Sequence, residues 1–226
     1  MSEPTRFSTT DLEGVGAFIA RNEARDRELA TRAAADAARR AAENAAANFT
    51  AARCPDRHVA ALGPDLTANR QWAAYLERLL HSVCHGGGTW ALLVDRGTGK
   101  TQLATALCRK ASWHATCRYC KALDLFRDIR ATFDGGNERE VVGRLARVGV
   151  LVIDEIHQRG QSDWERNTLA NLIDRRYDGR RTTVLIGNLT VAAFAEVVGD
   201  SIVSRMQETG GALVCDWPSY RQEVRP

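Results

Sequence analysis

Residues with phosphate-binding chemistry lie together at 97–101, where the chain reads Gly-Thr-Gly-Lys-Thr. An apolar run of strand length precedes them, and a segment with apolar residues at helical spacing follows. Glycines let backbone N–H groups turn toward a phosphate, and the N-terminus of a helix adds partial positive charge. Lys100 is placed to reach the β- and γ-phosphates, and the hydroxyl of Thr101 to hold Mg²⁺. The pattern predicts a site for nucleotide phosphates and Mg²⁺, with nucleotide contacts from Asp95, Arg96, Gly97, Thr98, Gly99, Lys100, Thr101 and Gln102.

One position departs from the full G-x-x-x-x-G-K-[ST] motif. Its first glycine is replaced by Val94. A β-branched residue does not easily adopt the dihedral angles of glycine. The departure predicts weak or conditional turnover. The alternative is that the sequence Gly-Thr-Gly-Lys-Thr occurs by chance on an ordinary strand–helix turn.

A second group of chemical residues is the acidic pair Asp154 and Glu155. It ends a nearly continuous apolar run over 148–153, which is typical of a strand buried on both faces of a parallel sheet. Open α/β sheets bind ligands at the carboxyl ends of their strands. Asp154 is therefore expected to complete the Mg²⁺ shell, directly or through water, and Glu155 to polarise an attacking water. An acidic strand end in a simple turn is the alternative.

These residues require a scaffold of alternating strands and helices. Strand-like stretches occur at 90–94, 116–122, 148–155, 180–188 and 213–216, with helical periodicity between them. The helix over 123–133 is expected to direct Leu123, Phe126 and Ile129 inward. Asn188 is a polar residue at the carboxyl end of the fourth stretch. The expected fold class is α/β, with a five-stranded parallel sheet flanked by helices.

Composition excludes some classes of protein and leaves others open. The chain has 226 residues and a net charge of +3, which neither demands nor excludes nucleic acid. It has neither an apolar run long enough to span a membrane nor an apolar signal core, so we expect a cytoplasmic protein without a membrane partner. Cys117 and Cys120 form a C-x-x-C pair, for which buried structural cysteines and a metal or redox role are both open.

The chain is expected to have two parts. Residues 1–50 form an alanine-rich helical arm, since alanine is the strongest helix former, and residues 51–226 form the nucleotide-binding domain. The arm carries an apolar stripe of Leu12, Val15, Phe18 and Ile19. A solvated helix and a docking segment that enters a groove on a partner are equally compatible with this pattern.

Together, the ordered motifs resemble the core of an AAA+ ATPase, and more closely the DnaC family of bacterial replicative helicase loaders. The related IstB transposition ATPases are similar. The resemblance covers roughly residues 50–226. It rests on the motifs at 151–156 (LVIDEI), 173–177 (IDRRY), 186–190 (IGNLT), 202–206 (IVSRM) and 216–221 (DWPSYR).

The resemblance implies roles for single residues. Asn188 looks like the polar residue that helps place the attacking water. Arg205 resembles the arginine finger that acts on a neighbouring subunit's γ-phosphate, with a surface salt-bridge arginine as the alternative. Arg175 and Arg176 are weaker candidates for such a contact, with structural pairing as the alternative. Ser201 stands where the family often has arginine.

The resemblance also implies partners. These are a replicative DnaB-type helicase bound through the N-terminal arm, single-stranded DNA, and other copies of this chain, since no C-terminal helical lid is expected to cover the nucleotide. Arginines after the phosphate loop are candidates for DNA contact, with a solvated helix face as the alternative: Arg118, Arg127, Arg130, Arg139, Arg144 and Arg147. Two other functions stay open, an IstB-like transposition ATPase and a nucleotide-dependent adaptor with little hydrolysis because of Val94.

Overall fold

The computed structural model describes residues 9–63, 69–94, 96–133, 136–160 and 162–219, with side chains from residue 21 on except at residue 24. The chain divides into two compact units, Met1–Glu43 and Asn44–Pro226. The predicted division at residue 50 stays a prediction. Among the described residues, no helix has the length and apolar character needed to cross a membrane.

The first unit consists, in its described part, of the greater part of helix α1 (Thr9–Ala51). Every described side chain from residue 21 to residue 43 is exposed. Ion pairs at helical spacing join Arg27 to Glu23 and Arg32 to Glu28. Alanine propensity and these local pairs therefore account for the helix in this stretch. The side chains of Leu12, Val15, Phe18 and Ile19 lie outside the described residues, so both interpretations of the arm stay open.

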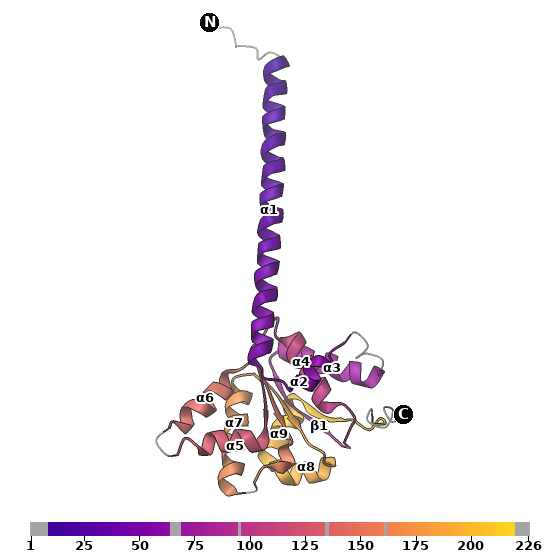
Figure 1. The fold of residues 1–226 in the computed structure, drawn as a ribbon, viewed down its shortest axis with the longest axis vertical. Coiled ribbons are helices and arrows are strands. Elements are labelled where there is room, and N and C mark those ends of the chain that lie inside the picture. The colour runs from indigo at the N-terminus through magenta and orange to yellow at the C-terminus, as the bar shows by residue number, and fades with distance from the viewer. Residues whose placement is uncertain (1–8, 64–68, 95, 134–135, 161, 220–226) are drawn as a thin grey trace. The chain divides into compact units, whose positions relative to one another are not determined.

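The second unit is built on a parallel sheet in the order β2-β3-β4-β1-β5. Figure 1 labels β1 and the helices of this unit. The strands are β1 (Gly88–Leu93), β2 (Cys117–Lys121), β3 (Val150–Asp154), β4 (Thr182–Ile186) and β5 (Gly211–Val214). β1, β3 and β4 are buried along their whole length. The apolar runs are therefore continuous because helices cover both faces of these strands.

One face of the sheet packs on the first core. It is covered by α3 (Arg70–Cys84) and α4 (Lys100–Ala111), with the last turns of α1 beside them. Short helix α2 (Asp56–Ala60) contacts α4 through the Gln102 side chain. In this core Leu92 of β1 packs with Leu79 and Leu107.

The other face packs on a second core with α5 (Ala122–Arg130), α6 (Glu138–Arg147), α7 (Asp163–Asp178), α8 (Val191–Val198) and α9 (Asp200–Thr209). The 3₁₀ turn η2 (Ile156–Gln158) joins β3 to this side. Ala91 and Leu93 point into this core, whereas Leu92 between them points into the first. This alternation is the period of a strand.

The sequence prediction for α5 was wrong at Leu123 and at both ends of the helix. The helix begins at Ala122, directly after β2, and ends at Arg130. Its buried face consists of Ala122, Leu125, Phe126 and Ile129, which follow the i, i+3, i+4, i+7 spacing. Leu123 lies off this face and is exposed.

Candidate functional site: a phosphate loop beside an acidic strand end

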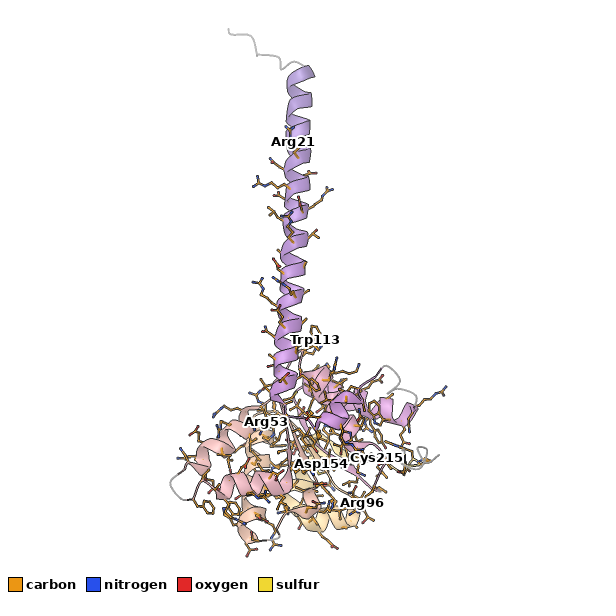
Figure 2. The ribbon with its side chains drawn as sticks, viewed as in Figure 1. Arg21, Arg53, Arg96, Trp113, Asp154 and Cys215 are labelled. Carbon is orange, nitrogen blue, oxygen red and sulfur yellow. The ribbon has the colours of Figure 1, made fainter. Side chains whose placement is uncertain are left out.

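The loop between β1 and α4 has the backbone of a glycine-rich turn. Gly97 and Gly99 have φ values of +89° and +83°, a region that glycine occupies without steric penalty. Gly99 is the N-cap of α4, and no side chain among the described residues caps this helix. An anion bound in this loop would meet the partial positive charge at the N-terminus of α4. Asp95 lies outside the described residues, and Arg96 is exposed on the loop (Figure 2).

Val94 holds the loop conformation despite its β-branched side chain. Its φ is +81°, in the left-handed region that costs a non-glycine residue about 1–2 kcal/mol. The Val94 N–H donates to the Leu189 carbonyl at 3.0 Å, and the Val94 carbonyl accepts from Lys100 Nζ at 2.7 Å. The side chain packs against the second core. Valine at this position therefore strains the loop.

Lys100 has a buried side chain directed into this loop. It is only 6% exposed, and its ammonium group lies 2.7 Å from the Val94 carbonyl and 3.4 Å from Thr98 Oγ1. A buried ammonium requires nearby acceptors. Here they include two oxygens of the loop itself, where a phosphate offers a stronger, charged acceptor.

Asp154 lies at the end of β3, and its carboxylate meets the start of α4. Its Oδ2 accepts hydrogen bonds from Thr101 Oγ1 at 2.8 Å and from the Tyr119 hydroxyl at 2.7 Å. Its Oδ1 accepts the Glu155 N–H at 2.7 Å. A hydroxyl and a carboxylate in contact are the oxygen ligands that Mg²⁺ prefers, so the residues present fit this ion.

Glu155 follows with a φ of +55°, in the left-handed region of backbone conformation. Its Oε2 lies 3.0 Å from Nζ of Lys121, the last residue of β2. The hydrogen bond and the charge of Glu155 raise the pKa of Lys121. The carboxylate that the sequence assigns to water activation is therefore held by a neighbouring strand.

Asn188 is brought close to the loop by the backbone around it. It follows β4 and is half-buried. The next residue, Leu189, accepts the Val94 N–H, and Gly187 N donates to the Leu92 carbonyl at 3.1 Å. Three sequence-predicted groups thus meet at one edge of the sheet: the phosphate loop, the acidic pair and Asn188.

Gln102 and Arg205 have other surroundings. The Gln102 side chain faces α2, where its Nε2 donates to the His58 carbonyl at 3.1 Å and its Oε1 lies 2.7 Å from His58 Nδ1. Arg205 is on α9, with Nε 2.8 Å from Asp174 Oδ1 and a second nitrogen 2.8 Å from the Ser201 carbonyl. Its guanidinium also lies over the Tyr177 ring at 5.5 Å. These contacts of Arg205 belong to α7 and α9.

Arg176, a weaker candidate, is a structural residue. It is fully buried and donates to the carbonyls of Leu145, Val148 and Thr182 at 2.6–2.9 Å. Burial lowers its pKa to about 9. Its neighbour Arg175 is exposed.

The paired cysteines do not converge on one site. Cys117 lies in the first core and donates to the Cys108 carbonyl at 3.6 Å. Cys120 packs against the second core, and burial raises its pKa to about 12. The described part of the chain holds no group of three or more His, Cys, Asp or Glu side chains arranged for a metal ion. These observations favour structural cysteines.

Sequence reasoning missed three residues of this site, Tyr119, Lys121 and Trp217. The Trp217 indole donates to the Thr98 carbonyl at 2.7 Å. Tyr119 and Lys121 reach the acidic pair because β2 lies beside β3 in register, with Lys121 opposite Asp154. The sequence shows that a tyrosine and a lysine lie in a strand-like segment. It does not show which strand pairs with this segment, so their contact with the acidic pair could not be predicted.

Comparison with known proteins agrees with this geometry. The family described as IstB-like ATP binding protein matches residues 72–207. Over 134 residues the chain is 31% identical to a protein of Buchnera aphidicola subsp. Schizaphis graminum named replicative helicase loader DnaC, covering 57% of this chain and 54% of that protein. The protein of the same name from Escherichia coli K12 is 29% identical over 133 residues, with the same coverage. The chain spans about half the length of the curated relatives it matches.

Solved structures show the same fold. A crystal structure of the DnaC helicase loader superposes with a TM-score of 0.57 at 22% identity, covering 68% of this chain and 93% of that one. The AMPPCP-bound DnaA of Aquifex aeolicus gives a TM-score of 0.56 at 18% identity, covering 68% and 47%. The likeness confirms the predicted AAA+ type of α/β fold.

Proposed function

The chain belongs to the IstB-like ATP-binding protein family, and from this premise we propose that it is an ATP-dependent loader of a replicative helicase. Its similarity to proteins named replicative helicase loader DnaC supports this choice within the family. Its proposed place of action is the cytoplasm, without a membrane partner.

The observation that carries the ATP part of the proposal is the contact between Thr101 and Asp154. A hydroxyl at the start of α4 and a carboxylate at the end of β3 meet at 2.8 Å beside the buried Lys100. We assign Lys100 and the loop amides to the phosphates, with Thr101 and Asp154 holding Mg²⁺. When bound, Mg²⁺ neutralises charge on the phosphates. Asp95, Arg96 and Gln102 remain proposed nucleotide contacts.

We assign hydrolysis to the residues around this pair. Glu155 accepts a proton from, or polarises, the attacking water, and Asn188 positions that water. Arg205 lies with α7 and α9, so its proposed role requires a second copy of the chain, whose phosphate it stabilises. Self-association is therefore part of the proposal.

The proposed partners follow the two parts of the chain. Residues 1–50 bind the DnaB-type helicase, and residues 51–226 bind nucleotide and single-stranded DNA. The exposed side chains over 21–43 are compatible with a docking role for the helix. Two of the arginines proposed for DNA contact already form ion pairs within the chain: Arg130 with Glu165 at 3.0 Å and Arg127 with Asp124 at 3.6 Å. Binding of DNA phosphates by these two arginines therefore competes with a carboxylate.

Two specific observations support the alternatives. The matching family description names IstB, which favours a transposition ATPase that acts with a transposase. The strained Val94 favours a nucleotide-dependent adaptor with little hydrolysis.

The test combines nucleotide binding with partner capture, using the full chain. Lys100→Ala should weaken binding of a fluorescent ATP analogue about 10–100-fold, because a charged hydrogen bond to phosphate contributes about 1.5–3 kcal/mol. Lys110→Ala, at the exposed end of the same helix, is the matched control and should leave binding unchanged. Equal binding by both variants would refute the phosphate assignment.

Capture separates the candidate functions. The tagged chain is mixed with purified replicative helicase or with a transposase, in the presence of ATP and Mg²⁺. Retention of helicase, with ATP turnover stimulated by single-stranded DNA, supports the loader. Retention of transposase alone supports the IstB-like alternative, and helicase retention without turnover supports the adaptor.

A further inference from the structure

The segment that follows β5 returns to the phosphate loop. Cys215 N donates to the carbonyl of Leu93, the last residue of β1, at 3.1 Å. Two residues later, the Trp217 indole Nε1 donates to the carbonyl of Thr98 at 2.7 Å. Trp217 belongs to the DWPSYR motif of the sequence, to which the proposed catalytic roles assign nothing.

Helix α3 holds this segment in place. The Tyr75 hydroxyl donates to the Val214 carbonyl at 3.0 Å, and Gln71 Nε2 donates to Asp216 Oδ1 at 3.3 Å. The rings of Tyr75 and Trp217 are tilted against each other, with centroids 5.8 Å apart. Trp217 also packs against the first core. The indole N–H therefore reaches the loop from a side chain fixed by packing.

The loop needs such external contacts because of Val94. A non-glycine residue at a φ of +81° is strained, and strain of this kind persists only where the surroundings over-determine the conformation. At the start of the loop, the Leu189 carbonyl accepts the Val94 N–H. From the end of the loop, Lys100 Nζ donates to the Val94 carbonyl. Trp217 holds the carbonyl of Thr98, a residue that is only 2% exposed.

We propose that Trp217 is a positioning residue, which holds the phosphate loop in its binding conformation against the strain at Val94. Its effect on nucleotide affinity rests on the proposed function, whereas its effect on the loop does not. The hydrogen bond from Trp217 to the Thr98 carbonyl is a single bond between neutral groups, which contributes about 1 kcal/mol. Its loss should therefore raise the opening equilibrium constant of the loop by roughly five- to tenfold.

The experiment measures the loop directly in the nucleotide-free full chain. Hydrogen–deuterium exchange of a peptide that covers residues 96–103 is followed in wild type and in Trp217→Phe, which keeps an aromatic ring beside Tyr75 but lacks the N–H. The matched control is Trp90→Phe, which removes another indole hydrogen bond in the first core, the one to Ser82 Oγ at 3.0 Å. Thermal unfolding checks that the variants remain folded.

The expected result is faster exchange of this peptide, about five- to tenfold, in Trp217→Phe alone. Val94→Gly in the same background relieves the strained residue and should restore most of the protection. A positioning role is overturned if Trp217→Phe and Trp90→Phe leave the loop equally protected, or if Val94→Gly restores nothing.

Nucleotide binding separates this inference from the proposed function. If wild type binds the fluorescent ATP analogue, Trp217→Phe should weaken that binding by a similar factor, and Val94→Gly should recover it. If wild type binds none while Trp217→Phe still loosens the loop, the proposed function fails and the positioning role stands. If wild type binds and the loop does not respond to Trp217→Phe, the positioning role fails alone.

Discussion

The Tyr119 hydroxyl lies 2.7 Å from Asp154 Oδ2, the same oxygen that accepts the Thr101 hydroxyl at 2.8 Å. The tyrosine comes from β2, the aspartate from β3 and the threonine from the first turn of α4. Three elements thus fix one carboxylate oxygen. The contact joins the sheet to the helix that opens at the phosphate loop, and it ties the chemistry of the site to the stability of the fold.

Tyr119→Phe should lower the free energy of unfolding near neutral pH by about 1.5–3 kcal/mol, because a hydrogen bond to a charged group is lost. Burial, with the charge and hydrogen bond of Asp154, raises the pKa of Tyr119. The unfolded chain releases the Tyr119 proton near pH ~10, whereas the folded chain keeps it. The contribution of the Tyr119–Asp154 hydrogen bond to the free energy of unfolding is therefore complete below that pH and is lost as the pH rises above it.

Urea unfolding of wild type and Tyr119→Phe at about pH 8 and about pH 11 checks both parts. The difference between the two proteins should shrink at the higher pH, by at most about 1.4 kcal/mol per pH unit. The other titrating groups are common to both proteins and cancel in the difference. A difference that grows with pH would contradict the assignment.

Glu155→Gln should leave nucleotide binding nearly unchanged and reduce steady-state ATP hydrolysis about 10²-fold or more, since the amide cannot act on the attacking water. Lys121→Met is the matched variant, because it also breaks the 3.0 Å ion pair but keeps the carboxylate. It should retain turnover within a few-fold and change stability by less than about 1 kcal/mol, because the pair is partly exposed. An equal loss of ATP turnover in both variants would mean that hydrolysis depends on the ion pair between Glu155 and Lys121, and not on the Glu155 carboxylate alone.

Variants of Arg205 and of its partner Asp174 distinguish a role of Arg205 across subunits from a simple surface ion pair. Arg205→Ala should reduce ATP turnover by about 10³-fold with little change in nucleotide affinity. Asp174→Asn breaks the same 2.8 Å pair but leaves the arginine in place, so turnover should persist. Turnover that falls equally in the two variants, or in neither, would assign Arg205 to local structure. Single-turnover kinetics at high protein concentration provide the measurement.

Arg176→Met should destabilise the second unit by about 2–4 kcal/mol, because three backbone carbonyls lose the buried guanidinium that donates to them. The adjacent Arg175→Met removes the same chemistry from an exposed position and should shift the unfolding free energy by less than about 0.5 kcal/mol. Arg176→Lys should rescue only part of the loss, since a single ammonium cannot follow the fork of the guanidinium. Equal stability of the two methionine variants would show that the buried arginine is dispensable.

Local pattern was enough to predict most of the fold and the backbone course of the candidate site. The apolar runs ending at Leu93 and Asp154 predicted buried parallel strands, and the strand–glycine–lysine order predicted the loop. These features depend on residues adjacent in the chain, where period and turn chemistry act directly. The error at Leu123 came from the helix boundary, since a start at Ala122 selects Leu125 for the core.

The sequence by itself therefore determined the fold class and the order of strand, glycine turn and helix, whereas phosphate binding by this loop and the roles of the acidic pair stay predictions. Only the tertiary structure decided which distant residues support them: Tyr119 and Lys121 through the pairing of β2 with β3, and Trp217 through the return of the chain after β5. It also decided that Arg176 is buried while Arg175 is exposed. The physical reason is that such contacts depend on strand order and helix packing, which arise from burial summed over the whole unit.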